Sequence, residues 1–416
     1  MIRRRSIARH LVLYDPVRHE NLRAFRWCDA DARVAIDRIA EDARTAFTPD
    51  GLWPVHPVDL SPERPADCLK PMFNGAGGVF WALRRLRAHG AAVDALDDRA
   101  ILAALPDLQR EDDVRLNRER SPSFAIGDTG LALLAWWDNP DTAHASALMS
   151  CINACAAQAE QGFALGAAGG LLASLFAFER SGDTHWRAAY ERHANALWLR
   201  WTDEPELGGH HWLQTLYGHR DRPLGALHGL GGIQFALMRG FRSFEDERLV
   251  THAERTRKVL LATASRADAF ANWPRGAGPS TRESDNERLL QHCMGAPGIV
   301  ATSAWIPAGE DPAFDALLLQ AGALIWHAGP TKKLPSLCHG APGSGYAFLK
   351  LYERTGAEVW LHRARQFGLH GVQQADLALS KFGQRKYSLW TGDLGLALFL
   401  QDCLRARAEI PLFDVF

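Results

Sequence analysis

Two short segments of the chain carry the residue types that most directly indicate chemistry. Residues 292–298 read His-Cys-Met-Gly-Ala-Pro-Gly, and residues 337–343 read Leu-Cys-His-Gly-Ala-Pro-Gly. Each segment places a cysteine, Cys293 or Cys338, two residues before a glycine, and His339 follows the second cysteine. Two thiolates and one imidazole suit Zn²⁺, and three protein ligands leave one tetrahedral position open, as in catalytic zinc sites. The alternative is that both cysteines are small buried apolar residues, the usual state of free cysteine.

Other polar residues stand at related positions. His228 directly precedes a glycine of the same kind, as the histidine of the second segment does. His228 is either a catalytic histidine or a core histidine that is hydrogen-bonded to a backbone carbonyl. Asp128 and Asp393 each follow such a glycine, where the helix dipole also favours an acidic residue. Lys332 and Lys333 precede the second cysteine segment and either meet an anionic ligand or lie in a solvated loop.

A repeat positions these residues. The frame Gly-x-x-Gly recurs seven times, and each copy opens a segment that is apolar nearly all round, as a helix buried on every side must be. More amphipathic stretches of helical period lie between the copies, and no convincing alternating strand pattern occurs. Seven pairs of inner and outer helices predict an all-α fold, an α/α toroid around a central cavity, with an open solenoid as the alternative. The frames begin at Gly75, Gly127, Gly166, Gly229, Gly295, Gly340 and Gly392.

The glycines of the frame have two possible roles. They can bind phosphate at helix N-termini, or they can permit tight turns and close helix packing. Because seven phosphate sites in one protein are not expected, packing is the favoured interpretation. Equivalent repeat positions lie on one rim of a toroid, and neighbouring inner helices are about 8–10 Å apart. Cys293 and Cys338 therefore come within reach of one ion.

Composition limits the function classes. The chain has 416 residues, 47 basic and 48 acidic, and a formal net charge of −1, so neither nucleic acid nor an anionic membrane surface is an expected partner. No apolar stretch is long enough for a membrane span. Seven cysteines, an odd and sparse number, indicate free thiols in a reducing compartment and predict a cytoplasmic protein. Since no linker divides the chain, we expect one domain over residues 1–416, with repeats from about residue 71 to 404.

Together these motifs resemble those of the lanthionine synthetase C-like proteins over about residues 71–404. The resemblance rests on the seven Gly-x-x-Gly helices and on the Cys-x-Gly-Ala-Pro-Gly and Leu-Cys-His-Gly motifs. Residues 225–232, Gly-Ala-Leu-His-Gly-Leu-Gly-Gly, and residues 388–395, Ser-Leu-Trp-Thr-Gly-Asp-Leu-Gly, also fit. Residues 124–130 are more similar to the eukaryotic-type, glutathione-binding branch than to dedicated peptide cyclases.

The resemblance implies an α/α toroid in which Cys293, Cys338 and His339 hold zinc. It further implies that zinc binds a substrate thiol, which adds to the double bond of dehydroalanine or dehydrobutyrine in a peptide or protein. The thiol is glutathione in the eukaryotic-type branch and a cysteine of the same peptide in the cyclases. His228 and Asp128 match family residues near the metal, and we expect His228 to be a general acid that Asp128 tunes.

The chain also departs from the family pattern. The cyclases carry an arginine four residues before the first metal cysteine, where this chain has Leu289, with Arg288 one place earlier. We expect Arg288 and Lys333 to bind the thiol ligand. The family usually has histidine or tyrosine directly after the first cysteine, whereas Met294 stands here and cannot donate a proton.

Three functions remain open at this point. The first is a zinc enzyme that forms thioethers, with glutathione addition favoured over cyclisation because the chain carries no dehydratase domain. The second is a non-catalytic protein that keeps the zinc or glutathione site. The third is a carbohydrate-active toroid with Asp128 and Asp393 as its acid and base, which leaves the matched cysteines unexplained.

Overall fold

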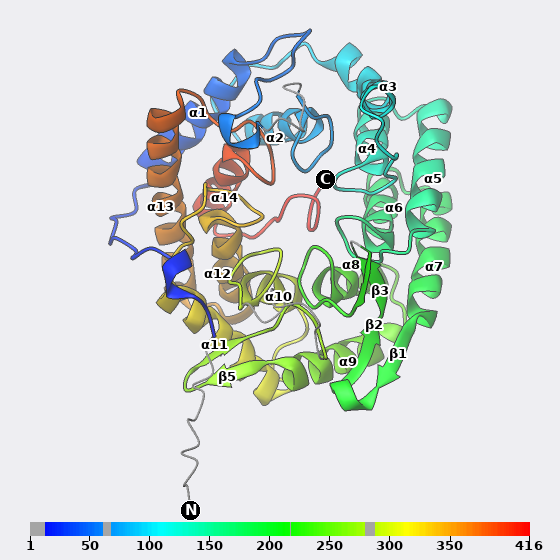
Figure 1. Ribbon diagram of the computed structural model, residues 1–416, viewed down its shortest axis with the longest axis vertical. Coiled ribbons are helices and arrows are strands. Elements are labelled where there is room, and N and C mark those ends of the chain that lie inside the picture. Colours follow the sequence, from blue (N-terminus) through cyan, green and yellow to red (C-terminus); the bar gives the residue numbers. More distant parts are fainter. Residues whose placement is uncertain (1–12, 61–67, 217, 279–287) are drawn as a thin grey trace, which may run out of the picture.

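The computed structural model describes residues 13–60, 68–216, 218–278 and 288–416, and these ranges contain fourteen α-helices in two concentric rings (Figure 1). The inner ring comprises α2 (Ala76–Ala88), α4 (Asp128–Asp138), α6 (Ala167–Ser181), α8 (Leu230–Ser243), α10 (Ala296–Ser303), α12 (Ala341–Thr355) and α14 (Asp393–Arg405). The outer ring comprises α1 (Asp29–Thr45), α3 (Arg99–Arg115), α5 (Thr142–Ala156), α7 (Thr184–Leu199), α9 (Arg248–Thr263), α11 (Pro312–Ala328) and α13 (Glu358–Phe382).

The inner ring is closed. Each inner helix contacts the next one, and α14 returns to contact α2. All residues of α10 are buried, whereas α1 in the outer ring buries a single face at helical spacing. The predicted α/α toroid is therefore confirmed, and the open solenoid is wrong.

The C-terminus lies inside the ring (Figure 1). The ring of Phe413 stacks on Phe163 with centroids 3.9 Å apart and lies 5.4 Å from Phe235. Phe416 lies 6.2 Å from Phe124 and 5.8 Å from Phe176. These aromatic contacts fill space at the centre of the toroid, where the sequence analysis expected a cavity.

The glycine frame sets where each inner helix begins. The first glycine of every frame is the N-cap of its helix. The second glycine packs directly against the backbone carbonyl six residues earlier: Gly298 against His292, and Gly343 against Leu337. A Cβ atom at either position would overlap that oxygen, so the frame serves close backbone packing.

The structure corrects one expectation of the sequence analysis, which found no strands. Three short antiparallel hairpins pair β1 (Trp201–Glu204) with β2 (Gly209–Trp212), β3 (Gln214–Leu216) with β4 (His219–Asp221), and β5 (Ser265–Ala267) with β6 (Phe270–Asn272). Strands of three or four residues are too short to show an alternating pattern. Short 3₁₀ turns span Pro16–Arg18 (η1), Pro57–Asp59 (η2) and Pro205–Leu207 (η3).

The seven cysteines are free, as expected from their number. Across the described ranges, no helix combines the length and the apolar character needed to cross a membrane.

Candidate metal centre

Backbone hydrogen bonds join equivalent positions of successive repeats along one rim of the toroid. These positions lie two residues before the first glycine of each frame. The N–H of Cys293 donates to the carbonyl of Cys338 at 3.3 Å, and the N–H of Cys338 donates to the carbonyl of Trp390 at 3.0 Å. The series continues with the N–H of Trp390 donating to the carbonyl of Phe73 and the N–H of Phe73 donating to the carbonyl of Ala125, each at 2.8 Å. The repeats are therefore equivalent at this position, and the rim places the two cysteines side by side as predicted.

The three residues predicted to bind a metal meet at this point. One sulfur from each cysteine and a ring nitrogen of His339 all lie within 4.8 Å of one another. Cys338 Sγ and His339 Nε2 are 3.3 Å apart. Both cysteines are buried and the histidine is half-buried, so the cluster sits below the surface with one side toward solvent.

Residues distant in the sequence hold the two loops in place. Asn272, at the end of β6, accepts a hydrogen bond from the N–H of Ala296 at 2.8 Å and donates to the carbonyl of Leu289 at 3.2 Å. Gly295, which lies between Leu289 and Ala296 in the sequence, adopts a φ of +97°, a left-handed conformation that favours glycine. Thr331 Oγ1 donates to the carbonyl of His339 at 2.7 Å.

The two thiols do not ionise alike. A hydrogen bond from the Cys338 thiol, together with His339 and the charge of Lys333, lowers the pKa of Cys293 to about 5, although burial opposes this. The hydrogen bond to Cys293 and burial raise the pKa of Cys338. One thiolate therefore exists readily, and a cation placed between the sulfurs would favour the second.

This donor set fits zinc. Two soft sulfurs and one imidazole converge from two adjacent loops, and their spread of 4.8 Å is within reach of one ion after small side-chain movements. The half-exposed side of His339 leaves room for a fourth ligand. The chemistry of the residues therefore supports a metal site with one open position.

A basic pocket of about 180 Å³ adjoins the cluster and contains both residues predicted to bind the thiol ligand, Arg288 and Lys333. Gln291 also lines this pocket, and its Oε1 accepts a hydrogen bond from the Cys293 thiol at 3.5 Å, so Gln291 lies between the pocket and the cluster. Burial lowers the pKa of Arg288. The remaining lining residues are Arg18, His19, Leu289, Leu290, Thr331 and Lys332. Four cationic side chains around so small a space favour an anionic ligand.

His228 and Asp128 are not joined directly. Burial and the charge of Arg275 lower the pKa of His228 to about 4, so its imidazole is neutral at pH 7. Asp128 is buried at the start of α4, and its Oδ2 pairs with Arg120 at 2.5 Å. No hydrogen bond or ion pair within the described ranges joins Asp128 to His228. Asp128 therefore makes no direct contact through which it could tune the pKa of His228 as expected.

Asp393 is held in the same way as Asp128. Its Oδ2 lies 3.2 Å from the buried guanidinium of Arg385. Burial raises the pKa of Asp393 to about 6, although Arg385 acts against this. Each carboxylate that a carbohydrate-active toroid would use as its acid or base is therefore paired with an arginine.

Several residues that build the site carry no sequence signal that predicts them. Gln291, Asn272 and Thr331 have no motif, and Arg18 and His19 lie more than 260 residues before the loops they face. The one local signal was the position of Gln291, two residues before Cys293.

The family model described as lanthionine synthetase C-like protein matches residues 71–414, and the chain belongs to this family. Among solved structures, nisin cyclase superposes with a TM-score of 0.51 at 13% identity, covering 90% of this chain and 98% of that one. At this identity the likeness shows the fold alone.

Two curated relatives are similar in sequence. The glutathione S-transferase LANCL1 of Danio rerio is 31% identical over 207 residues, 47% of this chain and 47% of the relative. The LanC-like protein GCL1 of Arabidopsis thaliana is 30% identical over 184 residues, 42% of this chain and 40% of the relative. The matched part thus spans less than half the length of either relative.

Proposed function

We propose that this protein is a zinc-dependent enzyme that adds a thiol, glutathione or a peptide cysteine, to dehydroalanine or dehydrobutyrine in a peptide or protein. The observation that carries the proposal is the convergence of Cys293, Cys338 and His339 next to a basic pocket. Family membership and the name of the Danio rerio relative support a transfer reaction in which a thiol is the donor.

Cys293, Cys338 and His339 would hold the zinc and leave one position for the substrate sulfur. When bound there, zinc lowers the pKa of a substrate thiol from its ordinary value of about 8.5, so that thiolate is present at pH 7. The chain's own contribution is to bury the two cysteines beside the basic pocket.

The basic pocket would bind the charged parts of the thiol substrate. Glutathione carries two carboxylates, and Arg288 and Lys333 in the pocket lining would bind them. The charge of Lys333 acts to lower the pKa of both cysteines, so the same side chain would favour bound thiolate. Cation–carboxylate hydrogen bonds of this kind also fix orientation.

His228 would move the proton. The reaction forms an S–C bond at the β-carbon, opens the carbon–carbon double bond and requires a proton at the α-carbon. Because burial holds the pKa of His228 at about 4, its neutral ring can first accept the proton that the thiol loses. The resulting imidazolium is then a strong acid for the α-carbon. This shuttle refines the expectation of a simple general acid.

A second candidate is a non-catalytic zinc or glutathione-binding protein of the same family. Met294 favours it, since a half-buried thioether follows Cys293 where the family resemblance implies a proton donor. The two candidates share the metal site and differ in turnover.

Mass spectrometry separates the two candidates. Zinc-loaded protein is incubated with glutathione and a peptide that contains dehydroalanine, and the adduct formed per unit time is compared with the spontaneous rate. The enzyme should exceed that rate, lose the excess when the metal is chelated and regain it when zinc is restored. Absence of acceleration with glutathione and with an internal cysteine would replace the enzyme by the binding protein.

A further inference from the structure

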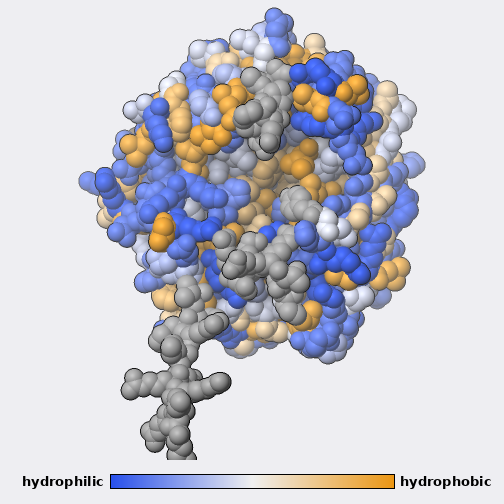
Figure 2. Space-filling view, in the orientation of Figure 1, coloured by the Kyte–Doolittle hydropathy of each residue, from blue (hydrophilic) through white to orange (hydrophobic). Residues whose placement is uncertain are grey.

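The segment after α14, residues 406–416, crosses the centre of the ring (Figure 1). The space-filling view shows this face hollowed near its middle, with apolar residues inside the hollow (Figure 2). Within the segment, Ile410, Leu412 and Phe413 are buried and belong to the hydrophobic core. The segment is therefore an internal element of the toroid and not a surface tail.

A buried lysine of α12 holds this segment in one conformation. Lys350 Nζ donates to Asp414 Oδ1 at 3.1 Å and to the carbonyl of Ala408 at 3.0 Å. The other oxygen of Asp414, Oδ2, accepts the N–H of Ile410 at 2.8 Å. Glu353 Oε1 accepts the N–H of Ala408 at 2.9 Å. Because the loss of one partner of a buried ion pair is strongly destabilising, the segment is held firmly in this turn.

The turn presents the ring of Phe413 to the loops of the metal centre. The centroid of this ring lies 5.9 Å from that of His292 and 5.8 Å from that of Trp390, distances typical of packed aromatic pairs. His292 directly precedes Cys293 in the sequence. The carbonyl of Trp390 accepts the N–H of Cys338 at 3.0 Å. One aromatic ring thus contacts a neighbour of each metal-binding cysteine.

His292 joins the two loops that carry the metal ligands. It belongs to the first loop and packs against Gly343 of the second, where an added Cβ would lie 3.1 Å from the Cβ of His292. Its Nδ1 lies 3.4 Å from the carbonyl of Gly343. The other ring nitrogen, Nε2, is buried and has no hydrogen-bond partner among the described residues. The orientation of the imidazole therefore depends on the rings packed against it, those of Phe413 and Trp390.

Phe413 is itself held from the opposite side of the ring. It stacks on Phe163 with centroids 3.9 Å apart and meets Phe235 of α8 edge-on at 5.4 Å. Arg239 of α8 donates to the carbonyl of Phe413 and pairs with Glu179 of α6 at 2.7 Å. The ring of Phe413 is therefore fixed between α6 and α8 on one side and the metal loops on the other.

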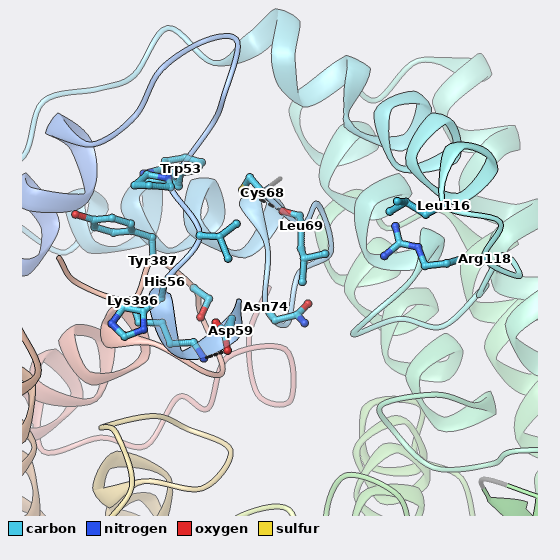
Figure 3. Close-up of a pocket in the computed structure, with 13 residues that line it drawn as sticks. Trp53, His56, Asp59, Cys68, Leu69, Asn74, Leu116, Arg118, Lys386 and Tyr387 are labelled. Carbon is cyan, nitrogen blue, oxygen red and sulfur yellow. Dashed lines mark hydrogen bonds and ion pairs between the residues drawn. The ribbon is translucent and has the colours of Figure 1, made fainter. Parts of the chain in front are cut away.

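The loop of Trp390 is fixed on its other side by polar contacts. Lys386 Nζ pairs with Asp59 Oδ1 at 2.7 Å, at the edge of a cavity of about 380 Å³ (Figure 3). Tyr387 donates its hydroxyl to Asp42 of the outer helix α1 at 2.7 Å. These contacts hold the loop toward the outer ring, while its inner side packs on the C-terminal segment.

We infer that Phe413 is a positioning residue of the metal centre, which acts through His292 and Trp390 to set the distance between the sulfurs of Cys293 and Cys338. The inference rests on the zinc site of the proposed function. Residues that orient a metal ligand from outside the coordination set usually change metal affinity when they are lost. Without the ring of Phe413 the two loops relax, and the sulfurs leave the positions that one ion requires.

Zinc affinity in two matched variants tests this role. Phe413→Ala removes the ring that contacts both loops, and Phe416→Ala removes a ring of the same segment that contacts Phe124 and Phe176 instead. Circular dichroism verifies that each variant is folded, and competition with a chelator gives its dissociation constant for zinc. Phe413→Ala should weaken zinc binding about 10–100-fold, the usual effect of losing a residue that orients a metal ligand, and Phe416→Ala less than about twofold. The ligand-field absorption of Co²⁺ in the same site should shift in Phe413→Ala alone.

A milder pair of variants keeps the test valid if Phe413→Ala does not fold. Phe413→Leu and its control Phe416→Leu keep most of the side-chain volume and lack the ring, and the first alone should weaken zinc binding. Because Phe413 acts through His292, the combined loss in Phe413→Leu with His292→Leu should be smaller than the sum of the two single losses.

The outcomes separate this inference from the proposed function. Equal zinc affinities in the Phe413 and Phe416 variants, or additive losses in the double variant, would overturn the role of Phe413. Normal thiol addition by the unaltered protein beside such results would leave the proposed function standing. An unaltered protein that binds no zinc would overturn the proposed function and the inference with it.

Discussion

Two stretches of the same rim, the loops before α10 and α12 and the loops before α4 and α6, share the glycine frame and differ in the side chains that it carries. In both, a first glycine caps the helix and a second packs against a carbonyl. At the position two residues before the first glycine, one stretch has Cys293 and Cys338 and the other has Ala125 and Ala164. The scaffold is thus repeated, and the chemistry depends on which side chains occupy one repeated position.

The difference also has a structural basis outside the repeat. Asn272 from the β5–β6 hairpin fixes the loop of Cys293, and Thr331 fixes the loop of His339. Arg18 and His19 reach the same area from the N-terminal part of the chain. Added segments, rather than the repeat, therefore build the pocket beside the cysteines.

The largest effect is expected from removing one of the rim cysteines. Cys338→Ala leaves two ligands, which hold zinc poorly, so metal and thiol addition should be lost together. The matched control is Cys403→Ala, a buried cysteine of α14 outside the cluster, which should keep both. Metal analysis and adduct formation are measured on each variant. Equal metal content in the two variants would remove the distinction between the cysteine stretch and the rest of the toroid.

The next effect separates proton transfer from metal binding. His228→Ala should keep full zinc content and slow thiol addition by about 10²–10⁴-fold, the usual range for losing an acid or base. Asp128→Asn should cost less, about tenfold, because the carboxylate contacts Arg120 and not the imidazole. The rate of adduct formation is measured at pH 7 for both variants. A larger loss for Asp128→Asn than for His228→Ala would contradict the assigned roles.

A third experiment tests the shared scaffold on the alanine side of the rim. Gly169→Ala places a Cβ against the carbonyl of Phe163 and should lower the free energy of unfolding by about 1–3 kcal/mol. Gly170→Ala, one residue further in α6, meets the Cβ of Cys155 at 3.3 Å, a tight contact that a shift of a few tenths of an ångström relieves. Since alanine also favours the helix, it should change stability by less than about 1 kcal/mol. Denaturant unfolding compares the two, and equal effects would refute the packing role of the frame.

The last effect, which appears only as the pH falls, concerns a buried imidazole of the outer ring. Burial lowers the pKa of His252 to about 3, so the unfolded chain binds its proton first as the pH falls below about 6.5. The wild-type protein should therefore lose stability relative to His252→Asn between about pH 6.5 and pH 3. The exposed His362→Asn is the control and should show no such trend. Denaturant unfolding at several pH values measures this effect. A difference in the free energy of unfolding between wild type and His252→Asn that stays constant with pH would contradict the neutral, buried state of this ring.

The sequence predicted the toroid because seven glycine frames and their apolar segments are local signals that survive in each repeat. It also placed Cys293, Cys338 and His339 together, since equivalent repeat positions share one rim. It could not predict the hairpins, whose strands are only three or four residues long. Nor could it find Arg120 as the partner of Asp128 or the N-terminal side of the basic pocket, because such partners are set by tertiary packing rather than by a motif.

The central claim is that the cysteine cluster holds a metal with one position open for a thiol. The most direct test replaces the metal by Co²⁺ and records the visible and near-ultraviolet spectrum before and after glutathione is added. One cobalt per chain should bind with the sulfur-to-metal absorption of two thiolates, and this absorption should rise by about half when the third sulfur enters. Failure to bind cobalt, or a spectrum that glutathione leaves unchanged, would contradict the account.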